Sequence, residues 1–237
     1  MTEKAPQRKY DKKYFRDEYT QTYLRRWEES PVHSRKNASE LIREHVKSLE
    51  KSGTDLGKLN YLGIGAGPGL TEFHNYSDCL EKFKSVAILD IAKRTPAFSR
   101  SDAKNVIDLE GDAENIPVKT GSIDLATCLL SQDFYPNRDK STQEIRRILK
   151  PGAKAIVFLH HPESYRGILK LTKNAEDASF FNHMLSGDRL FYDKERIRKH
   201  YEGNGLIVTG IRERKPKKPE EYWGYWWEVL LSKKAGK

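Results

Sequence analysis

Glycine and carboxylate residues occur in this chain at intervals that suit the binding of a nucleoside. Gly65, Gly67 and Gly69 alternate directly after an apolar segment, and Asp90 ends the next apolar segment. Glycine allows positive φ and leaves no Cβ between a turn and its ligand, so a helix that follows can offer its first N–H groups to that ligand. An acid about 20 residues further on can accept the hydroxyls of a ribose. The spacing therefore predicts a nucleotide or nucleoside site.

The elements that must position these residues are short strands alternating with helices. Five segments read as buried strands that end in polar loops: residues 60–64, 85–90, 106–109, 121–130 and 155–158. Short apolar runs separated by helical segments are typical of a parallel sheet covered on both faces. Because the carboxyl ends of parallel strands meet at one edge, we expect the glycine loop, Asp90 and the later acid Asp112 to lie along that edge.

Two other glycine-rich sites are excluded by the same residues. A dinucleotide fingerprint has the pattern G-x-G-x-x-G, whereas Gly65, Gly67 and Gly69 give G-x-G-x-G, and no second nucleotide-binding half follows. A P-loop carries a lysine and a hydroxyl residue after its last glycine, but here Leu70 and Thr71 follow Gly69.

With these motifs in this order, the chain resembles the class I S-adenosylmethionine-dependent methyltransferases, and within them the small-molecule group typified by the ubiquinone and menaquinone methyltransferases. The family's glycine loop corresponds to residues 65–69, its ribose-binding acid to Asp90 and its adenine-binding acid to Asp112. The motif that ends the family's core corresponds to residues 144–152. The resemblance covers residues 55–160 closely and implies S-adenosyl-L-methionine as cofactor and S-adenosyl-L-homocysteine as product.

The resemblance also implies the fold. We expect an α/β, Rossmann-like doubly wound sheet of seven strands in the order 3-2-1-4-5-7-6, with strand 7 antiparallel and an N-terminal helical lid. The 237 residues are then one methyltransferase domain. Within it we expect four parts: a lid over residues 1–52, a cofactor-binding core over 53–160, a substrate cover over 161–192, and a C-terminal helix and strands over 193–237.

In this family the cofactor lies against the glycine loop and the two acids, with apolar side chains on either side of the adenine. The corresponding residues here are Gly63, Gly65, Ala66, Gly67, Gly69, Asp90, Ile91, Asp112, Ala113 and Leu129. One position departs from the family pattern. Two residues before the first loop glycine the family usually has an acid, and here that residue is Gly63, so water or a main-chain carbonyl has to contact the methionine amino group.

Candidates for the methyl-transfer step follow the fourth and fifth strands. His160 and His161 stand at the edge where open α/β sheets bind ligands, so either could take a proton from an attacking nucleophile. Positioning alone can also accelerate transfer from a sulfonium, and a histidine here would then only bind substrate or close the loop. Five further residues are expected substrate contacts: Tyr19, Tyr23, Gln132, Asp133 and Tyr135.

Two N-terminal helices are predicted before the first strand. Aromatic residues recur every fourth position from Phe15 to Trp27, which predicts a helix over 13–29 ended by Pro31. This aromatic stripe either packs on the domain or lines the substrate mouth. Asn37 and Glu40 have the spacing of a capping box, which predicts a second helix over 38–51.

Composition limits the remaining possibilities. A net charge of +9, with cations between aromatic residues over 214–226, suits RNA as well as a small acceptor. We favour a small-molecule acceptor methylated on oxygen, nitrogen or carbon. RNA or protein methylation, or a non-catalytic S-adenosylmethionine-binding subunit, are the alternatives, and the oligomeric state stays open.

The remaining features concern location and cysteine chemistry. The sequence has no apolar run of about 20 residues and no signal-peptide pattern at its start, so we expect a cytoplasmic protein with no membrane span. Its two cysteines, Cys79 and Cys128, fall in a helix and a strand, so we expect reduced, buried thiols and neither a disulfide nor a metal site.

Overall fold

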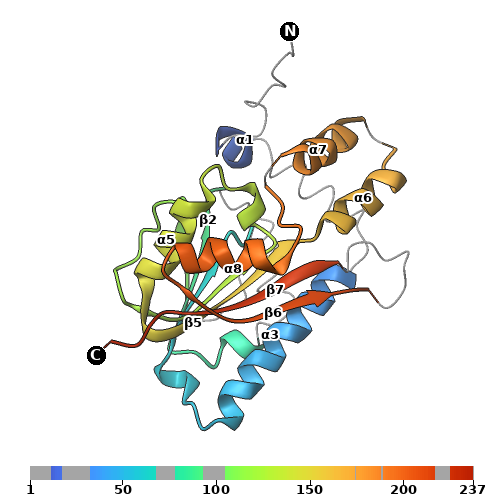
Figure 1. The fold of residues 1–237 in the computed structure, drawn as a ribbon. Helices are drawn as coiled ribbons and strands as arrows, with labels where there is room; N and C mark the ends of the chain where they lie inside the picture. Colours follow the sequence, from blue (N-terminus) through green and yellow to red (C-terminus); the bar gives the residue numbers. More distant parts are fainter. Residues whose placement is uncertain are drawn as a thin grey trace.

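The computed structural model describes residues 12–17, 33–67, 78–92, 105–173, 175–187, 189–216 and 225–236. Figure 1 shows a twisted sheet with helices packed against it and a group of short helices beyond one of its ends. None of the described helices is long and apolar enough to cross a membrane.

Seven strands form a single sheet in the order β3-β2-β1-β4-β5-β7-β6. The strands are β1 (Asn60–Ile64), β2 (Ser85–Asp90), β3 (Val106–Glu110), β4 (Ile123–Leu129), β5 (Leu149–His160), β6 (Ile207–Arg214) and β7 (Trp226–Ser232). The first five pair in parallel, and β7 runs antiparallel to both of its neighbours. The predicted strand order and the antiparallel seventh strand are confirmed.

One face of the sheet packs on α3 (His33–Lys51), whose Ile42 and Val46 are buried against Tyr61, Leu125 and other residues of β1, β2, β4 and β5. The predicted end of this helix is correct, but its predicted start at residue 38 is wrong. Helix α3 already begins at His33, so Asn37 lies inside it and does not cap it. No helix-breaking residue follows Pro31, so the helix can begin several residues earlier than the capping pattern indicates.

The other face packs on α5 (Arg138–Ile148) and α8 (Lys194–Gly203), which Figure 1 shows crossing in front of the strands. Ile145 and Ile148 of α5 and Ile197 and Tyr201 of α8 are buried in the core cluster on this side. Asp193 caps α8 by accepting the main-chain N–H of Arg196, so this helix begins at Lys194, at the start of the predicted C-terminal part.

A third apolar cluster lies beyond the carboxyl ends of the strands. It joins α1 (Lys12–Asp17), α6 (Pro162–Leu171) and α7 (Ala175–Ser186). Its buried members are Tyr14, Tyr165, Ile168, Phe180, Phe181, Met184 and Leu190. We call it the cover cluster, because it occupies the end of the sheet where the loops of β1 to β5 emerge. Helix α1 is the described part of the predicted 13–29 helix, and Tyr19, Tyr23 and Trp27 lie outside the described residues.

Candidate active site

The glycine loop follows β1 and is held by the main chain of β2. The N–H groups of Gly65 and Ala66 donate to the carbonyl of Leu89 at 2.8 and 3.2 Å. Gly65 has φ +65° and Gly67 has φ +61°, a region that side chains rarely adopt. A Cβ on Gly65 would also collide with the hydroxyl groups of Ser131 and Tyr135. The loop can therefore be built only with glycine at this position.

Those two hydroxyl groups form a small polar support beneath the loop. Ser131 donates to the carbonyl of Ile64 at 3.2 Å, and its Oγ lies 2.9 Å from the Tyr135 hydroxyl and 3.1 Å from the Cys128 thiol. Burial raises the pKa of Cys128 to about 11, and burial likewise raises the pKa of Tyr135 well above 10. Both groups are therefore neutral at physiological pH, and Tyr135 supports the loop from below. Cys79 and Cys128 are free and buried, as predicted.

Asp90 ends β2 directly beside the loop. Its Oδ2 accepts the N–H of Gly67 at 2.7 Å, and its Oδ1 accepts the N–H of Ala92 at 2.8 Å. These bonds fix the carboxylate at the strand end, beside the glycine loop. The position and the chemistry suit an acid that accepts two ribose hydroxyls, as the sequence predicts. The loop residue Gly69 lies outside the described residues.

Asp112 stands after β3 on the same edge and forms an ion pair that the sequence did not reveal. Its Oδ1 accepts the N–H of Glu114 at 2.8 Å, and its Oδ2 accepts Lys12 Nζ of α1 at 2.7 Å. Burial alone would raise the pKa of Asp112, but the bonds from Lys12 and from the Glu114 main chain outweigh it and hold that pKa below 3.8. Asp112 is therefore ionised, as an acceptor for an adenine amino group must be.

Glu114 completes this corner of the site. It is buried, its Oε2 accepts Lys12 Nζ at 2.6 Å, and its Oε1 accepts the N–H of Asn137 at 2.7 Å. Lys12 thus links two acids at the cofactor edge, while its neighbours in α1, Tyr14 and Phe15, pack in or against the cover cluster. Helix α1 therefore connects Asp112 and Glu114 to the cover cluster.

The apolar residues expected around the adenine lie at the same edge. Ala113 is buried, and Leu129 and Ile91 are partly exposed beside the ends of β4 and β2. Gly63 is buried inside β1, where it pairs with Ile88 on one side and Thr127 on the other. Gly63 adds no side chain to the site, so any contact from this residue comes from its main chain.

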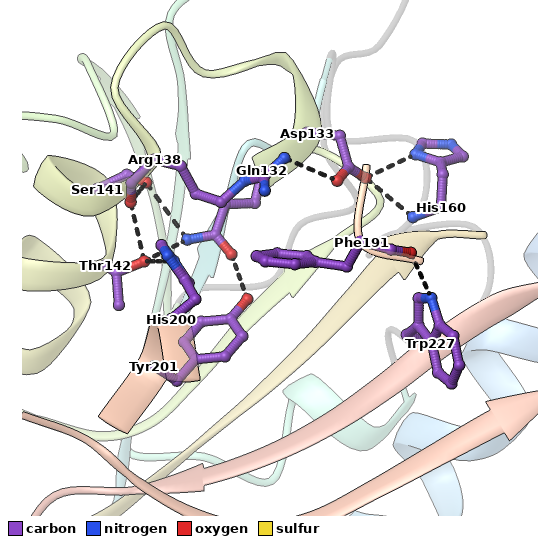
Figure 2. Close-up of polar contacts among 10 residues, drawn as sticks. All are labelled: Gln132, Asp133, Arg138, Ser141, Thr142, His160, Phe191, His200, Tyr201 and Trp227. Atoms are coloured by element: carbon purple, nitrogen blue, oxygen red, sulfur yellow. Dashed lines mark hydrogen bonds and ion pairs between the residues drawn. The ribbon is translucent and has the colours of Figure 1, made fainter. Parts of the chain in front are cut away.

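Asp133 and His160 form a hydrogen-bonded pair across the ends of β4 and β5. Asp133 belongs to the short helix η3 (Gln132–Phe134) and is fully buried. Its Oδ2 accepts both the main-chain N–H of His160 at 2.9 Å and its ring Nδ1 at 3.0 Å, as Figure 2 shows. A ring that donates from Nδ1 keeps a lone pair on Nε2. The rings of Phe134 and Tyr165 lie 5.5 and 4.8 Å from that of His160, centroid to centroid.

Two other predicted residues turn away from this centre. His161 caps α6 by accepting the N–H of Glu163 at 3.2 Å, and its ring packs on Trp227. Burial lowers the pKa of His161, although the nearby Glu213 opposes this. Gln132 is fully buried, donates to Thr142 of α5 at 2.8 Å and accepts the Tyr201 hydroxyl of α8 (Figure 2). Gln132 therefore ties two helices together and does not face an acceptor.

Residues 62–157 match a protein-family model described as a methyltransferase domain. A sterol 4-C-methyltransferase of Caenorhabditis elegans is 31% identical over 96 residues, which are 40% of this chain and 23% of that protein. The match therefore spans less than a quarter of that curated relative.

Solved structures extend the likeness to most of the chain. An S-adenosylmethionine-dependent methyltransferase of Thermotoga maritima superposes with a TM-score of 0.60 at 20% identity and covers 91% of this chain and 96% of its own. The cyclase SpnF superposes with a TM-score of 0.59 at 15% identity, over 85% of this chain and 81% of its own. At these identities the likeness establishes the fold alone.

The sheet order, the glycine loop and the acids that follow it define the class I S-adenosylmethionine-dependent methyltransferase fold. Residues 62–157 thus match a methyltransferase domain, the chain has the fold of S-adenosylmethionine-dependent methyltransferases, and S-adenosyl-L-methionine is the cofactor that both imply. The particular resemblance to the ubiquinone and menaquinone enzymes stays a prediction.

Proposed function

We propose that this chain transfers the methyl group of S-adenosyl-L-methionine to an oxygen, nitrogen or carbon atom of a small-molecule acceptor and releases S-adenosyl-L-homocysteine. One observation carries the proposal: Asp90, Asp112 and the Asp133–His160 pair follow consecutive or neighbouring strands along one edge of the sheet. A cofactor that bridges the first two acids would direct its reactive end toward the third group.

When bound, the cofactor supplies a methyl group on a sulfonium, which needs no further activation. The chain then has to hold the acceptor in line and to receive any proton that the acceptor loses. We assign proton acceptance to His160 Nε2. Asp133 positions that ring, since its carboxylate fixes the Nδ1–H tautomer and stabilises the imidazolium that forms. The Nδ1 of His161 is occupied as the α6 cap, and the carboxylate nearest to its ring, that of Glu213, lies 3.7 Å from Nε2.

Aromatic residues around His160 would keep the reaction away from water. Phe134 lies 5.7 Å from Phe15 of α1 and 5.9 Å from Phe180 of α7, centroid to centroid, so α1, η3 and α7 meet over the proposed base. A dry, apolar setting favours the compact transition state of methyl transfer, in which opposite charges are neutralised. We infer that the cover cluster binds the apolar body of the acceptor.

Three alternatives need separate evidence. RNA or protein methylation rests on the net charge of +9 and on residues 214–226, most of which lie outside the described residues. A non-catalytic subunit rests on Gly63 in place of an acid. The cyclase SpnF has the same fold, so the fold alone does not fix the reaction. A cytoplasmic location also stays a prediction.

The experiment is a test for release of S-adenosyl-L-homocysteine with three acceptor pools from one cell extract: molecules below about 3 kDa, purified RNA and purified protein. We expect turnover with the small-molecule pool and none after Asp90→Ala. Turnover restricted to RNA or protein would move the assignment to that class. Cofactor binding without turnover in any pool would favour the subunit.

A further inference from the structure

Arg138 lies beside the Asp133–His160 pair, and the charge of Arg189 acts on the same aspartate and on Arg138. Arg138 is the first residue of α5, and Arg189 lies in the segment between the cover helix α7 and α8. Together with Asp133 we call them the arginine cluster. The inference drawn from this cluster rests on the proposed function, because it concerns the acceptor for that reaction.

Asp133 is shared between partners on opposite sides, as Figure 2 shows. Its Oδ2 is occupied by the two bonds from His160, and its Oδ1 lies 3.5 Å from Arg138 Nη2. That distance is long for a hydrogen bond, and Oδ1 has no closer partner among the described residues. The Asp133 carboxylate therefore bonds fully to His160 and only weakly to Arg138.

Arg138 is largely buried and incompletely satisfied. Its side chain is 14% exposed, its guanidinium lies 4.3 Å above the ring centre of Phe191, and its Nε is buried with no hydrogen-bond partner in the described structure. A guanidinium has five N–H donors in a fixed fork, which suits a planar carboxylate. Arg138 thus has hydrogen-bonding capacity that no described residue uses.

Arg189 carries a second charge into the same place. It is partly buried and makes no hydrogen bond or ion pair with any described residue. Burial lowers its pKa first, repulsion from Arg138 lowers it further, and the attraction of Asp133 acts the other way. No described residue compensates for the partial desolvation of Arg189, and an uncompensated buried charge lowers stability.

We propose that Arg138 and Arg189 bind the carboxylate of the methyl acceptor, so that the acceptor is a small monocarboxylic acid. Two arginines against one aspartate leave a single positive charge, which one carboxylate neutralises. The ring of Phe191 and the cover cluster accommodate the apolar remainder of the acid. Because Asp133 contacts both Arg138 and His160, an acid anchored at Arg138 lies close to the proposed base.

The test measures acid binding to protein saturated with S-adenosyl-L-homocysteine. Acetate, benzoate and 3-phenylpropionate are titrated by calorimetry, each against its neutral amide. We expect one or more of these acids to bind about tenfold more tightly than the corresponding amide. The variant Arg189→Gln should lose this preference for the acid. Arg196→Gln is the matched control, since Arg196 is exposed on α8 and pairs only with Asp193.

A second readout separates ligand binding from a structural role. Arg189 has no described partner to lose, so the thermal midpoint of Arg189→Gln without ligand should equal or exceed that of the parent protein, whereas a structural residue would lower it. Three results would overturn the inference: no acid that binds better than its amide, an unchanged preference in Arg189→Gln, or inorganic phosphate that binds more tightly than every acid. Failure of S-adenosyl-L-homocysteine itself to bind would instead contradict the proposed function.

Discussion

The start of the glycine loop is fixed by main-chain hydrogen bonds to the neighbouring strand and by the Asp90 carboxylate, whereas the proposed acceptor side is assembled from side chains of distant segments. Gly65, Ala66 and Gly67 bond to the end of β2, one strand away. On the acceptor side, Asp133 meets His160 of another strand and Arg138 of a helix. Main-chain contacts depend little on side-chain identity, whereas side-chain contacts change with each substitution. The half that is built from side chains can therefore change its ligand without loss of the fold.

A substitution at Asp133 is expected to have the largest effect. It should abolish most of the catalysis and leave cofactor binding unchanged. Asp133→Asn removes the charge that stabilises the His160 imidazolium, and kcat should fall by about 10²-fold or more. The affinity for S-adenosyl-L-homocysteine should be unchanged, which separates this effect from misfolding. Asp55→Asn is the matched control, because Asp55 caps the short helix η1 (Leu56–Lys58), where asparagine caps equally well, and its other described partner is the exposed Lys58. An equal loss of kcat in both variants would remove the special role of Asp133.

His200 of α8 is expected to make the stability of the folded protein depend on pH. Burial and then the charge of Arg138 lower its pKa from 6.5 to about 4, although Asp139 acts in the opposite direction. The unfolded chain therefore binds a proton between pH 6.5 and 4 that the folded chain does not. Stability is fully present above pH 6.5 and declines as the pH falls toward 4.

The measurement is urea unfolding at pH 7 and pH 4.5 for the parent protein and for His200→Gln. The parent should lose about 2–3 kcal/mol more than the variant over this interval. Glutamine can keep the bond to Thr142 that His200 Nε2 makes at 2.9 Å, so both proteins should fold at pH 7. Equal losses in the two proteins would show that the pKa of His200 is the same in the folded and the unfolded protein.

A substitution at Lys12 is expected to have a smaller effect, on cofactor affinity. Lys12 belongs to α1 and bonds to Asp112, the acid that we expect to contact the cofactor. If Asp112 receives the adenine amino group, Lys12 competes for its Oδ2. Lys12→Met should then bind S-adenosyl-L-homocysteine roughly two- to fivefold more tightly, the size expected for a partly exposed ion pair. Lys13→Met in the same helix is the control, since its side chain is exposed. Weaker binding by Lys12→Met would mean that Lys12 helps to hold the adenine.

Sequence reasoning could predict a cofactor half because its signals are local. Glycines at alternate positions and an acid at a strand end are adjacent in the chain to the strands that place them, and the sheet order came with the family resemblance. The acceptor half gave weaker signals. His160 and Asp133 were both candidates, but no pattern showed that they bond to each other, since they are 27 residues apart. Lys12, Arg138 and Arg189 look like ordinary surface charges, and only the tertiary structure brings them to the site.

Two predicted features failed or moved for physical reasons. The capping box at Asn37 was wrong because a local pattern does not prevent a helix from starting earlier when the preceding residues are compatible with helix. Gln132 was expected beside the acceptor because it follows β4, yet its amide is taken up by Thr142 and Tyr201. Sequence position placed Gln132 at the correct edge but could not give the direction of its side chain.

The central claim is that Asp90 and the glycine loop bind S-adenosyl-L-methionine, and the most direct test is calorimetric titration of S-adenosyl-L-homocysteine into the parent protein and Asp90→Ala, with NAD as the control ligand. We predict that the parent binds S-adenosyl-L-homocysteine and not NAD, and that Asp90→Ala loses roughly 1–3 kcal/mol of binding free energy because the ribose hydroxyls lose their acceptor. Equal affinity in the two proteins, or equal binding of NAD, would contradict the account.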